Sequence, residues 1–291
     1  MGHVGMDDQH QALSATHRLV RRLVRKSASA CAAWHAVAQA GLCLLLVVTA
    51  FAQAGEPTAD EIARRLVRSD AFSWEGARTH VRMLLNEENG QSRERVMDIL
   101  GRRKNGLFQT LVRFLSPQDI AGTAFLMLER DKETSEQYIY LPGLKRTRRI
   151  VGREREGSFM GSDFTYTDMQ RIDSRYATNK RLPDEALSGE AAYVLESTLH
   201  ADAPSSYGRV MTWVRKSDYV ALRTRFYDKQ DKLVKTLYTR KVKQIDGKPV
   251  VVDARMQSQL SKHSTDLFIE SVERRDDLSD ASFTPAALEH L

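Results

Sequence analysis

Cysteine is nearly absent from this chain. The two cysteines, Cys31 and Cys43, both lie within the first 54 of its 291 residues. The remaining part, residues 55–291, therefore can form neither a disulfide nor a thiolate metal site. If the N-terminal segment is removed, the chain that remains is indifferent to an oxidising compartment.

Histidine and the common catalytic motifs are also scarce. Residues 55–291 hold four scattered histidines, which are His80, His200, His263 and His290. No G-x-S-x-G, H-E-x-x-H, EF-hand, Walker or G-x-G-x-x-G pattern occurs in the sequence. We therefore expect no metal and no cofactor.

A general excess of positive charge is missing from most of the chain. The formal net charge is +6, but residues 1–54 supply half of it, with five basic residues against Asp7 and Asp8. The near balance in residues 55–291 gives no support for a nucleic-acid-binding surface. The chain is 42% hydrophobic and 28% charged, which is typical of a globular protein.

The N-terminus has the pattern of an export signal. A basic region at residues 18–26 precedes an apolar run at residues 41–52, and Ala52 and Ala54 fit the small-residue rule for cleavage after Ala54. We expect residues 1–54 to be an extension plus signal peptide and residues 55–291 to be one domain. The alternatives are a retained anchor over residues 28–54 and a true start codon downstream of Met1.

Residues 56–72 have the pattern of a helix. Thr58 and Glu61 form a capping box, and Ile62, Leu66 and Val67 follow helical spacing.

After this helix the apolar period changes to two, which indicates strands. Ala77, Thr79, Val81, Met83 and Leu85 alternate with polar residues, and Asn89-Gly90 predicts a hairpin turn. About ten or eleven strands are expected in all. They cover residues 77–85, 92–106, 107–117, 123–131, 136–143, 192–201, 208–218, 219–230, 233–247, 249–259 and 266–275. Short polar turns between them predict an antiparallel sheet that curls strongly or closes.

Several long apolar side chains are expected on one face of this sheet, where they can fill a solid core or line a hollow. They are Val81, Met83, Leu85, Leu111, Phe125, Met127, Met211 and Trp213.

A basic stretch follows the fifth expected strand. It contains Lys145, Arg146, Arg148, Arg149, Arg153 and Arg155. Arg146 and Arg148 would share one strand face, and such a cluster can hold a lipid phosphate, a membrane surface or an acidic partner. The simpler alternative is a solvated strand that Glu154 and Glu156 balance in part.

Residues 158–168, which we call the aromatic loop, come directly after this stretch. The loop carries four large side chains, Phe159, Met160, Phe164 and Tyr166, while Gly157 and Gly161 can act as hinges. It can be a flap packed on the sheet, or a mobile lid that packs on itself when empty and on acyl chains when loaded.

The same loop also allows an enzymatic interpretation. Ser162 can be a nucleophile, and Asp163 and Asp168 can be a pair of glycosidase carboxylates. No elbow motif surrounds Ser162 and no histidine lies near it in sequence. Because such residues more often cap turns, hydrolysis is the weaker alternative.

Four segments together resemble the bacterial outer-membrane lipoprotein-sorting protein family, a LolA-like group. They are "GTAFLMLER", "EQYIYLPGLKRTRRI", "SFMGSDFTYTDM" and the ending "LSDASFTPAAL". The resemblance implies a mostly β fold with a few helices, an incomplete antiparallel β-barrel (LolA/LolB-like) that wraps an apolar cavity with a helical lid. It also implies a monomeric, non-enzymatic carrier in the periplasm.

The resemblance further implies partners and ligand-binding residues. The expected ligands are acyl chains of lipoproteins or lipids, with an inner-membrane transporter as donor and an outer-membrane acceptor, and no nucleic acid. Phe159, Met160, Phe164 and Tyr166 would grip the chains, and Lys145, Arg146, Arg148 and Arg149 would form the polar half of the grip. The long basic and aromatic block departs from the best-known relatives. A carrier or adaptor for a membrane exporter of other lipids, and a docking surface in an envelope complex, therefore stay open.

Overall fold

Thirteen antiparallel strands form one open sheet in the computed structural model, which describes residues 55–68, 76–130, 135–170 and 176–290. The predicted signal peptide and the alternative anchor lie outside the described residues. The first six strands are β1 (Ala77–Asn86), β2 (Ser92–Lys104), β3 (Leu107–Ser116), β4 (Ala124–Glu129), β5 (Ser135–Leu141) and β6 (Arg146–Ile150). The others are β7 (Ala177–Leu187), β8 (Glu190–Leu199), β9 (Tyr207–Arg215), β10 (Ala221–Asp228), β11 (Leu233–Ile245), β12 (Lys248–Ser258) and β13 (Ser264–Arg274).

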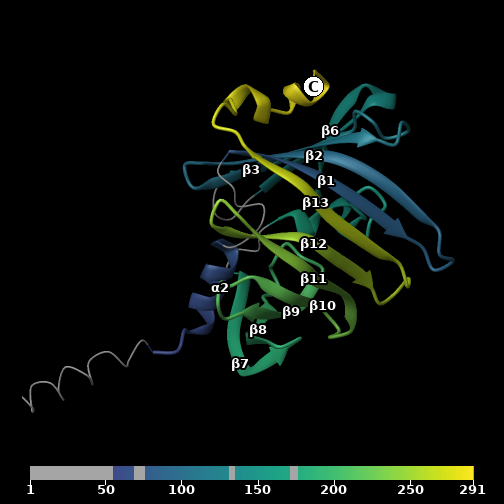
Figure 1. Ribbon diagram of the computed structural model, residues 1–291. Helices are drawn as coiled ribbons and strands as arrows, with labels where there is room; N and C mark the ends of the chain where they lie inside the picture. Colours follow the sequence, from purple (N-terminus) through teal and green to yellow (C-terminus); the bar gives the residue numbers. More distant parts are fainter. Residues whose placement is uncertain (1–54, 69–75, 131–134, 171–175, 291) are drawn as a thin grey trace, which may run out of the picture. The chain divides into compact units, whose positions relative to one another are not determined.

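The order of the strands is β6-β5-β4-β3-β2-β1-β13-β12-β11-β10-β9-β8-β7. Within β1–β6 and within β7–β13 each strand pairs with its neighbour in sequence, and β1 pairs with β13, so the two halves of the sheet meet there. The sheet curls from β6 to β7 (Figure 1) without pairing these two strands. The prediction of an incomplete antiparallel barrel is confirmed.

Strand β7 escaped the sequence prediction. It contains Pro183 and many exposed polar side chains, so it shows no clear alternation. Proline lacks an N–H donor and is tolerated at the edge of a sheet. The edge position of β7 therefore explains both its composition and the failure of the pattern to reveal it.

Helix α2 (Ala59–Arg68) follows Thr58, whose Oγ1 accepts a hydrogen bond of 3.2 Å from the backbone N–H of Glu61. Residues 69–72, which were predicted to extend this helix, lie outside the described residues. Short 3-10 segments are η2 (Pro142–Leu144), η3 (Gly152–Glu156), η4 (Thr167–Met169), η6 (Asp280–Phe283) and η7 (Ala286–Glu289). In the described part of the chain, no helix has the length and apolar character needed to cross a membrane.

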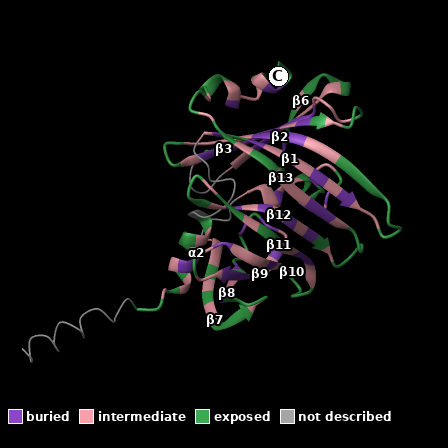
Figure 2. Cartoon of the chain, in the orientation of Figure 1, coloured by how far each residue is buried: buried purple, intermediate pink, exposed green. Residues whose placement is uncertain are grey.

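The two faces of the sheet bury different sets of side chains. We call the face that carries Val81, Met83 and Leu85 the inner face. All three are buried, as the alternation predicted, and buried residues alternate mainly with partly buried ones along β1 and β12 (Figure 2). The largest apolar cluster lies on this face and includes Val81, Met83, Leu85, Met97, Ile99, Val112, Phe114, Phe125, Met127, Ile139, Ile150 and Met256.

Three residues expected on the inner face lie on the opposite, outer face. Leu111 packs with Phe283 and Leu288 of the C-terminal segment, and Met211 and Trp213 belong to a separate cluster with Val194. Successive residues of a strand point to opposite faces. An error of one residue in choosing which positions point inward therefore moves every side chain of that strand to the other face. The C-terminal 3-10 segments thus cover the outer face at β3 and β4.

Candidate functional site

The aromatic loop folds back on itself. The Phe159 N–H donates to the Phe164 carbonyl at 2.7 Å, and Ser158 and Thr165 form an isolated β-bridge. Met160 and Gly161 take φ values of 53° and 78°, and glycine suits such a left-handed turn. The loop is therefore a defined turn with its own hydrogen bonds.

Ser162, the possible nucleophile, serves this turn. Its Oγ donates to the Phe159 carbonyl at 2.7 Å and accepts from the Phe164 N–H at 3.3 Å. The residue is buried, and both partners of the hydroxyl are backbone groups of the loop itself. This geometry assigns Ser162 a structural role as a turn-former.

The aromatic side chains of the loop pack on the inner face. The Phe159 ring centroid lies 5.9 Å from that of Phe114, 5.3 Å from that of Phe125 and 5.5 Å from that of Tyr166. Phe159 is only 2% exposed, Phe164 is also buried, and Met160 and Tyr166 pack against the same cluster. The structure thus brings together all four apolar residues that the sequence selected, over the strands of the first half.

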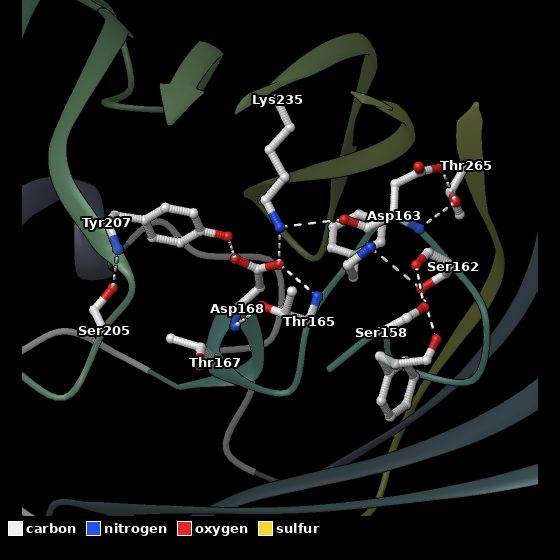
Figure 3. Close-up of polar contacts among 12 residues, drawn as sticks. Ser158, Ser162, Asp163, Thr165, Thr167, Asp168, Ser205, Tyr207, Lys235 and Thr265 are labelled. Carbon is white, nitrogen blue, oxygen red and sulfur yellow. Dashed lines mark hydrogen bonds and ion pairs between the residues drawn. The ribbon is translucent and has the colours of Figure 1, made fainter. Parts of the chain in front are cut away.

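A buried ion pair fastens the other side of the loop (Figure 3). Lys235 of β11 forms an ion pair with Asp168, and these side chains are 7% and 6% exposed. Asp168 also accepts hydrogen bonds from the Tyr207 hydroxyl at 2.9 Å and from the Thr165 N–H at 2.6 Å. Lys235 donates in addition to the Asp163 carbonyl at 3.2 Å. Such complete pairing is what buried charges require.

Burial and charge keep the Tyr207 hydroxyl of this anchor protonated. Burial, followed by the negative charge of Asp168, raises the pKa of Tyr207 well above its usual range. Tyr207 therefore remains a hydrogen-bond donor to Asp168 at all ordinary pH values.

Asp163 makes a third attachment, to β13. The Thr265 hydroxyl donates to Asp163 Oδ2 at 2.7 Å and accepts from the Asp163 N–H at 2.9 Å. Burial raises the pKa of Asp163, and the hydrogen bond from Thr265 opposes this rise. Both loop carboxylates are thus engaged in anchoring, and within the described residues no three His, Cys, Asp or Glu side chains are grouped to hold a metal ion.

The basic stretch divides between the two faces of edge strand β6. Arg146 and Arg148 lie opposite Leu141 and Ile139 on the inner side, whereas Arg149 lies opposite Tyr138 on the outer side. The predicted shared face of Arg146 and Arg148 is confirmed, but Arg149 does not join them. A single four-residue basic site is therefore not formed.

Ion pairing separates these cations further. Arg148 pairs with Glu154 at 2.9 Å and Arg149 with Glu136 at 3.0 Å. Lys145 and Arg146 are exposed and form no ion pair with any residue that the structure describes. The predicted polar half of the grip is thus an exposed rim in which two cations are uncommitted.

Two cations on the inner face were missed at the level of sequence. Lys235 lies on β11 opposite Ser258, and Arg95 lies on β2 opposite Met83. Each occupies a position whose neighbours two residues along its strand, Leu237 and Met97, point inward. A charge at an inward position of a period-two pattern is the signal that can reveal such residues.

Comparison with known proteins agrees with this architecture. A family profile whose description reads "Uncharacterized protein" matches residues 106–290. No curated protein matches the chain.

Solved structures give closer likenesses. A domain from Vibrio parahaemolyticus described as an outer membrane lipoprotein-sorting protein is 30% identical, with a TM-score of 0.73 and coverage of 79% of this chain and 97% of that one. A DUF1329 family protein from Desulfovibrio piger is 28% identical, with a TM-score of 0.73 over 80% and 100% of the two chains. A LolA superfamily protein from Nitrosomonas europaea shares the fold at 20% identity, with a TM-score of 0.64 over 79% and 98%. The chain belongs to the outer membrane lipoprotein-sorting protein family, and its fold is LolA-like.

Proposed function

We propose that this protein is a periplasmic carrier that holds acyl chains of lipoproteins or other lipids against the inner face of its sheet and moves them toward the outer membrane. The observation that carries the proposal is the position of the aromatic loop. Its four large side chains cover the inner apolar cluster, although the loop is not a strand of the sheet. A covering of this kind can move away without breaking the sheet.

Exchange of the loop for a ligand is energetically plausible because one apolar surface replaces another. Each CH2 group removed from water contributes about 0.8 kcal/mol. An acyl chain that takes the place of Phe159 and Met160 on the inner face therefore restores the burial that is lost when the loop moves. The displaced side chains of the loop then pack on the acyl chain and contribute to the bound state. Binding and release then need no covalent step, in keeping with the structural role of Ser162.

The anchor on the second side of the loop makes the exchange selective. Lifting the loop separates Lys235 from Asp168, and separating a buried ion pair costs several kcal/mol. Empty protein thus stays closed, and only a ligand that contributes enough burial opens it.

The rim at β6 is the proposed contact with a donor or acceptor. Leu144 and Val151, which are 69% and 52% exposed, flank the basic strand. Exposed apolar groups beside uncommitted cations suit an inner-membrane transporter as donor and an outer-membrane acceptor. The same rim supports the second candidate, a carrier or adaptor for a membrane exporter of lipids other than lipoproteins.

A loop variant tests the proposal. We expect the triple variant Phe159→Ser, Met160→Ser, Phe164→Ser to lose binding of a fluorescent fatty acid while circular dichroism retains the signal of the sheet. The matched control replaces two exposed apolar residues outside the rim, Leu115 and Leu260, with serine and should bind like the parent.

A milder change covers the case in which the triple variant unfolds. Met160→Ser alone alters a partly buried side chain and should weaken binding severalfold. Absence of fatty-acid binding by the parent protein, or full binding by Met160→Ser, would count against the proposal.

A further inference from the structure

Arg95 is an arginine on the inner face that forms no ion pair with the described residues, and the negative charge of Asp119 acts on it without pairing. The Nη1 atom of Arg95 is buried and makes no hydrogen bond in the described part of the chain. Buried guanidinium groups normally have all their donors satisfied. Arg95 therefore holds a hydrogen-bonding capacity that the protein itself leaves unused.

Other arginines of the sheet show the usual arrangement. Arg78 pairs with Asp98 at 2.6 Å, and Arg255 pairs with Asp266 at 2.6 Å. Arg223 also has a buried nitrogen without a partner, but it lies on the outer face over the Trp213 ring, 3.8 Å from the centroid. Within the described residues, the Arg95 guanidinium pairs with no carboxylate and lies over no aromatic ring.

The surroundings of Arg95 are electrostatically favourable to an anion. Burial lowers the pKa of Arg95, the positive charge of Arg93 acts in the same direction, and Asp119 opposes them. Arg93 itself is paired with Glu87 at 2.9 Å. The guanidinium thus lies in a partly desolvated position beside a second cation, where an added negative charge is stabilised.

The aromatic loop lies directly against this guanidinium. Arg95 Nη2 is 3.6 Å from the position that a Cβ atom on Gly161 would occupy. A group that displaces the loop at Gly161 therefore comes into contact with Arg95, next to the surface that Met160 and Phe159 vacate.

We infer that Arg95 binds the anionic headgroup, a phosphate or carboxylate, of the acyl-bearing ligand whose chains replace the aromatic loop. This inference rests on the proposed carrier function and adds the chemical class of the cargo. A planar guanidinium offers two parallel donors to a phosphate or carboxylate, which a neutral headgroup does not match.

The loop anchor strengthens the requirement for an anion. When the loop lifts, Asp168 leaves Lys235, so the inner face carries two uncompensated cations, Lys235 and Arg95. A neutral ligand leaves both without a partner in a partly desolvated site, whereas an anionic ligand compensates at least one of them. Opening is therefore expected to be coupled to a negatively charged cargo.

The test compares two lipids that share one oleoyl chain and differ in the phosphate, lysophosphatidic acid and monoacylglycerol. Both displace the uncharged probe N-phenyl-1-naphthylamine from the full chain, and inorganic phosphate alone is a third arm. We expect the parent to bind lysophosphatidic acid about tenfold more tightly, since a charge-assisted hydrogen bond to a partly buried group is worth that factor. Arg95→Gln should reduce the ratio to near one, and Arg95→Lys should retain part of it.

Arg113→Gln is the matched control, because Arg113 is a half-buried strand arginine on the outer face with no ion pair among the described residues. It should keep the parent ratio. Any of three results would overturn the inference. They are equal affinities of the parent for the two lipids, an unchanged affinity ratio in Arg95→Gln, and an equal loss of the ratio in Arg95→Gln and Arg113→Gln. Competition by inorganic phosphate as strong as by the lipid would also overturn it in favour of a free-phosphate site. If neither lipid displaces the probe, the carrier function itself fails.

Discussion

The inner face has two covers that are held in different ways. The aromatic loop buries Phe159 and Phe164 over the first half of the sheet and is fastened by the buried pair of Asp168 and Lys235. Helix α2 lies over the other end of the face, where Ile62 packs on Tyr193, Leu195 and Val214.

The polar contacts of the two covers differ most. Those of α2 are at the surface, where Glu61 pairs with Arg65, and Arg65 donates to the Tyr219 hydroxyl at 2.7 Å. Those of the loop are buried, and removal of one partner from a buried ion pair costs far more free energy than removal of one partner from an exposed pair. The helix is thus a cover held by apolar packing and by exposed polar contacts, whereas the loop is held in addition by a buried ion pair.

Removal of one member of the buried pair of Asp168 and Lys235, which we call the latch, should have the largest effect on the free energy of unfolding. Lys235→Met leaves Asp168 buried without its cation, so we expect a loss of about 3–5 kcal/mol in the free energy of unfolding. The double variant Lys235→Met, Asp168→Leu should recover most of this loss. Urea titration measures both, and a single variant within about 1 kcal/mol of the parent would mean that the loop is not latched.

Truncation in the helix should cost less. Ile62 is fully buried, and Ile62→Ala is expected to lower the free energy of unfolding by about 2 kcal/mol, the lower end for such a change. Hydrogen exchange should then accelerate in α2 and stay slow at the Phe159 N–H. Equal acceleration in both places would show that the two covers open together and would contradict the distinction.

A smaller effect concerns pH. Burial raises the pKa of Asp163 in the folded protein, so the folded state binds the proton more tightly than the unfolded state. The contribution of Asp163 to stability is then greatest below its unfolded pKa of about 3.9 and declines as pH rises through the raised folded value. Asp163→Asn should remove this part of the decline. Urea titrations between pH 4 and 7 measure the free energy of unfolding of the parent and of Asp163→Asn. The same pH dependence in both proteins would contradict this prediction.

The smallest effect is expected at the surface of the helix. Glu61→Gln removes an exposed pair with Arg65, and such pairs contribute little. The midpoint of unfolding should not change measurably. A clear shift would show that the polar contacts of α2 hold the cover, against our comparison.

The sequence predicted the sheet well and the latch not at all. Period-two alternation identified strands such as β1, because most of its inward residues, such as Met83, are apolar. The alternation missed β7, whose composition at the edge of the sheet is mostly polar. It also assigned Trp213 to the wrong face, because the pairing with neighbouring strands decides which of the two alternating sets of side chains points inward. The aromatic loop was located from its composition.

The partners of the loop were beyond the reach of local patterns. Lys235 is 67 positions from Asp168 in sequence, and only the order of β9, β11 and β13 brings it to the loop. Likewise, the absence of a partner for Arg95 is a property of packing. Contacts between distant segments therefore carry the part of the site that the sequence did not reveal.

The central claim is that acyl chains occupy the place of the aromatic loop on the inner face. A photoreactive p-benzoylphenylalanine at position 160, in protein isolated from its native envelope, tests this directly by mass spectrometry of the cross-linked product. The account predicts an adduct with an acyl lipid at position 160 and none when the same group replaces the exposed Leu260. No lipid adduct at position 160, or equal adducts at both positions, would contradict it.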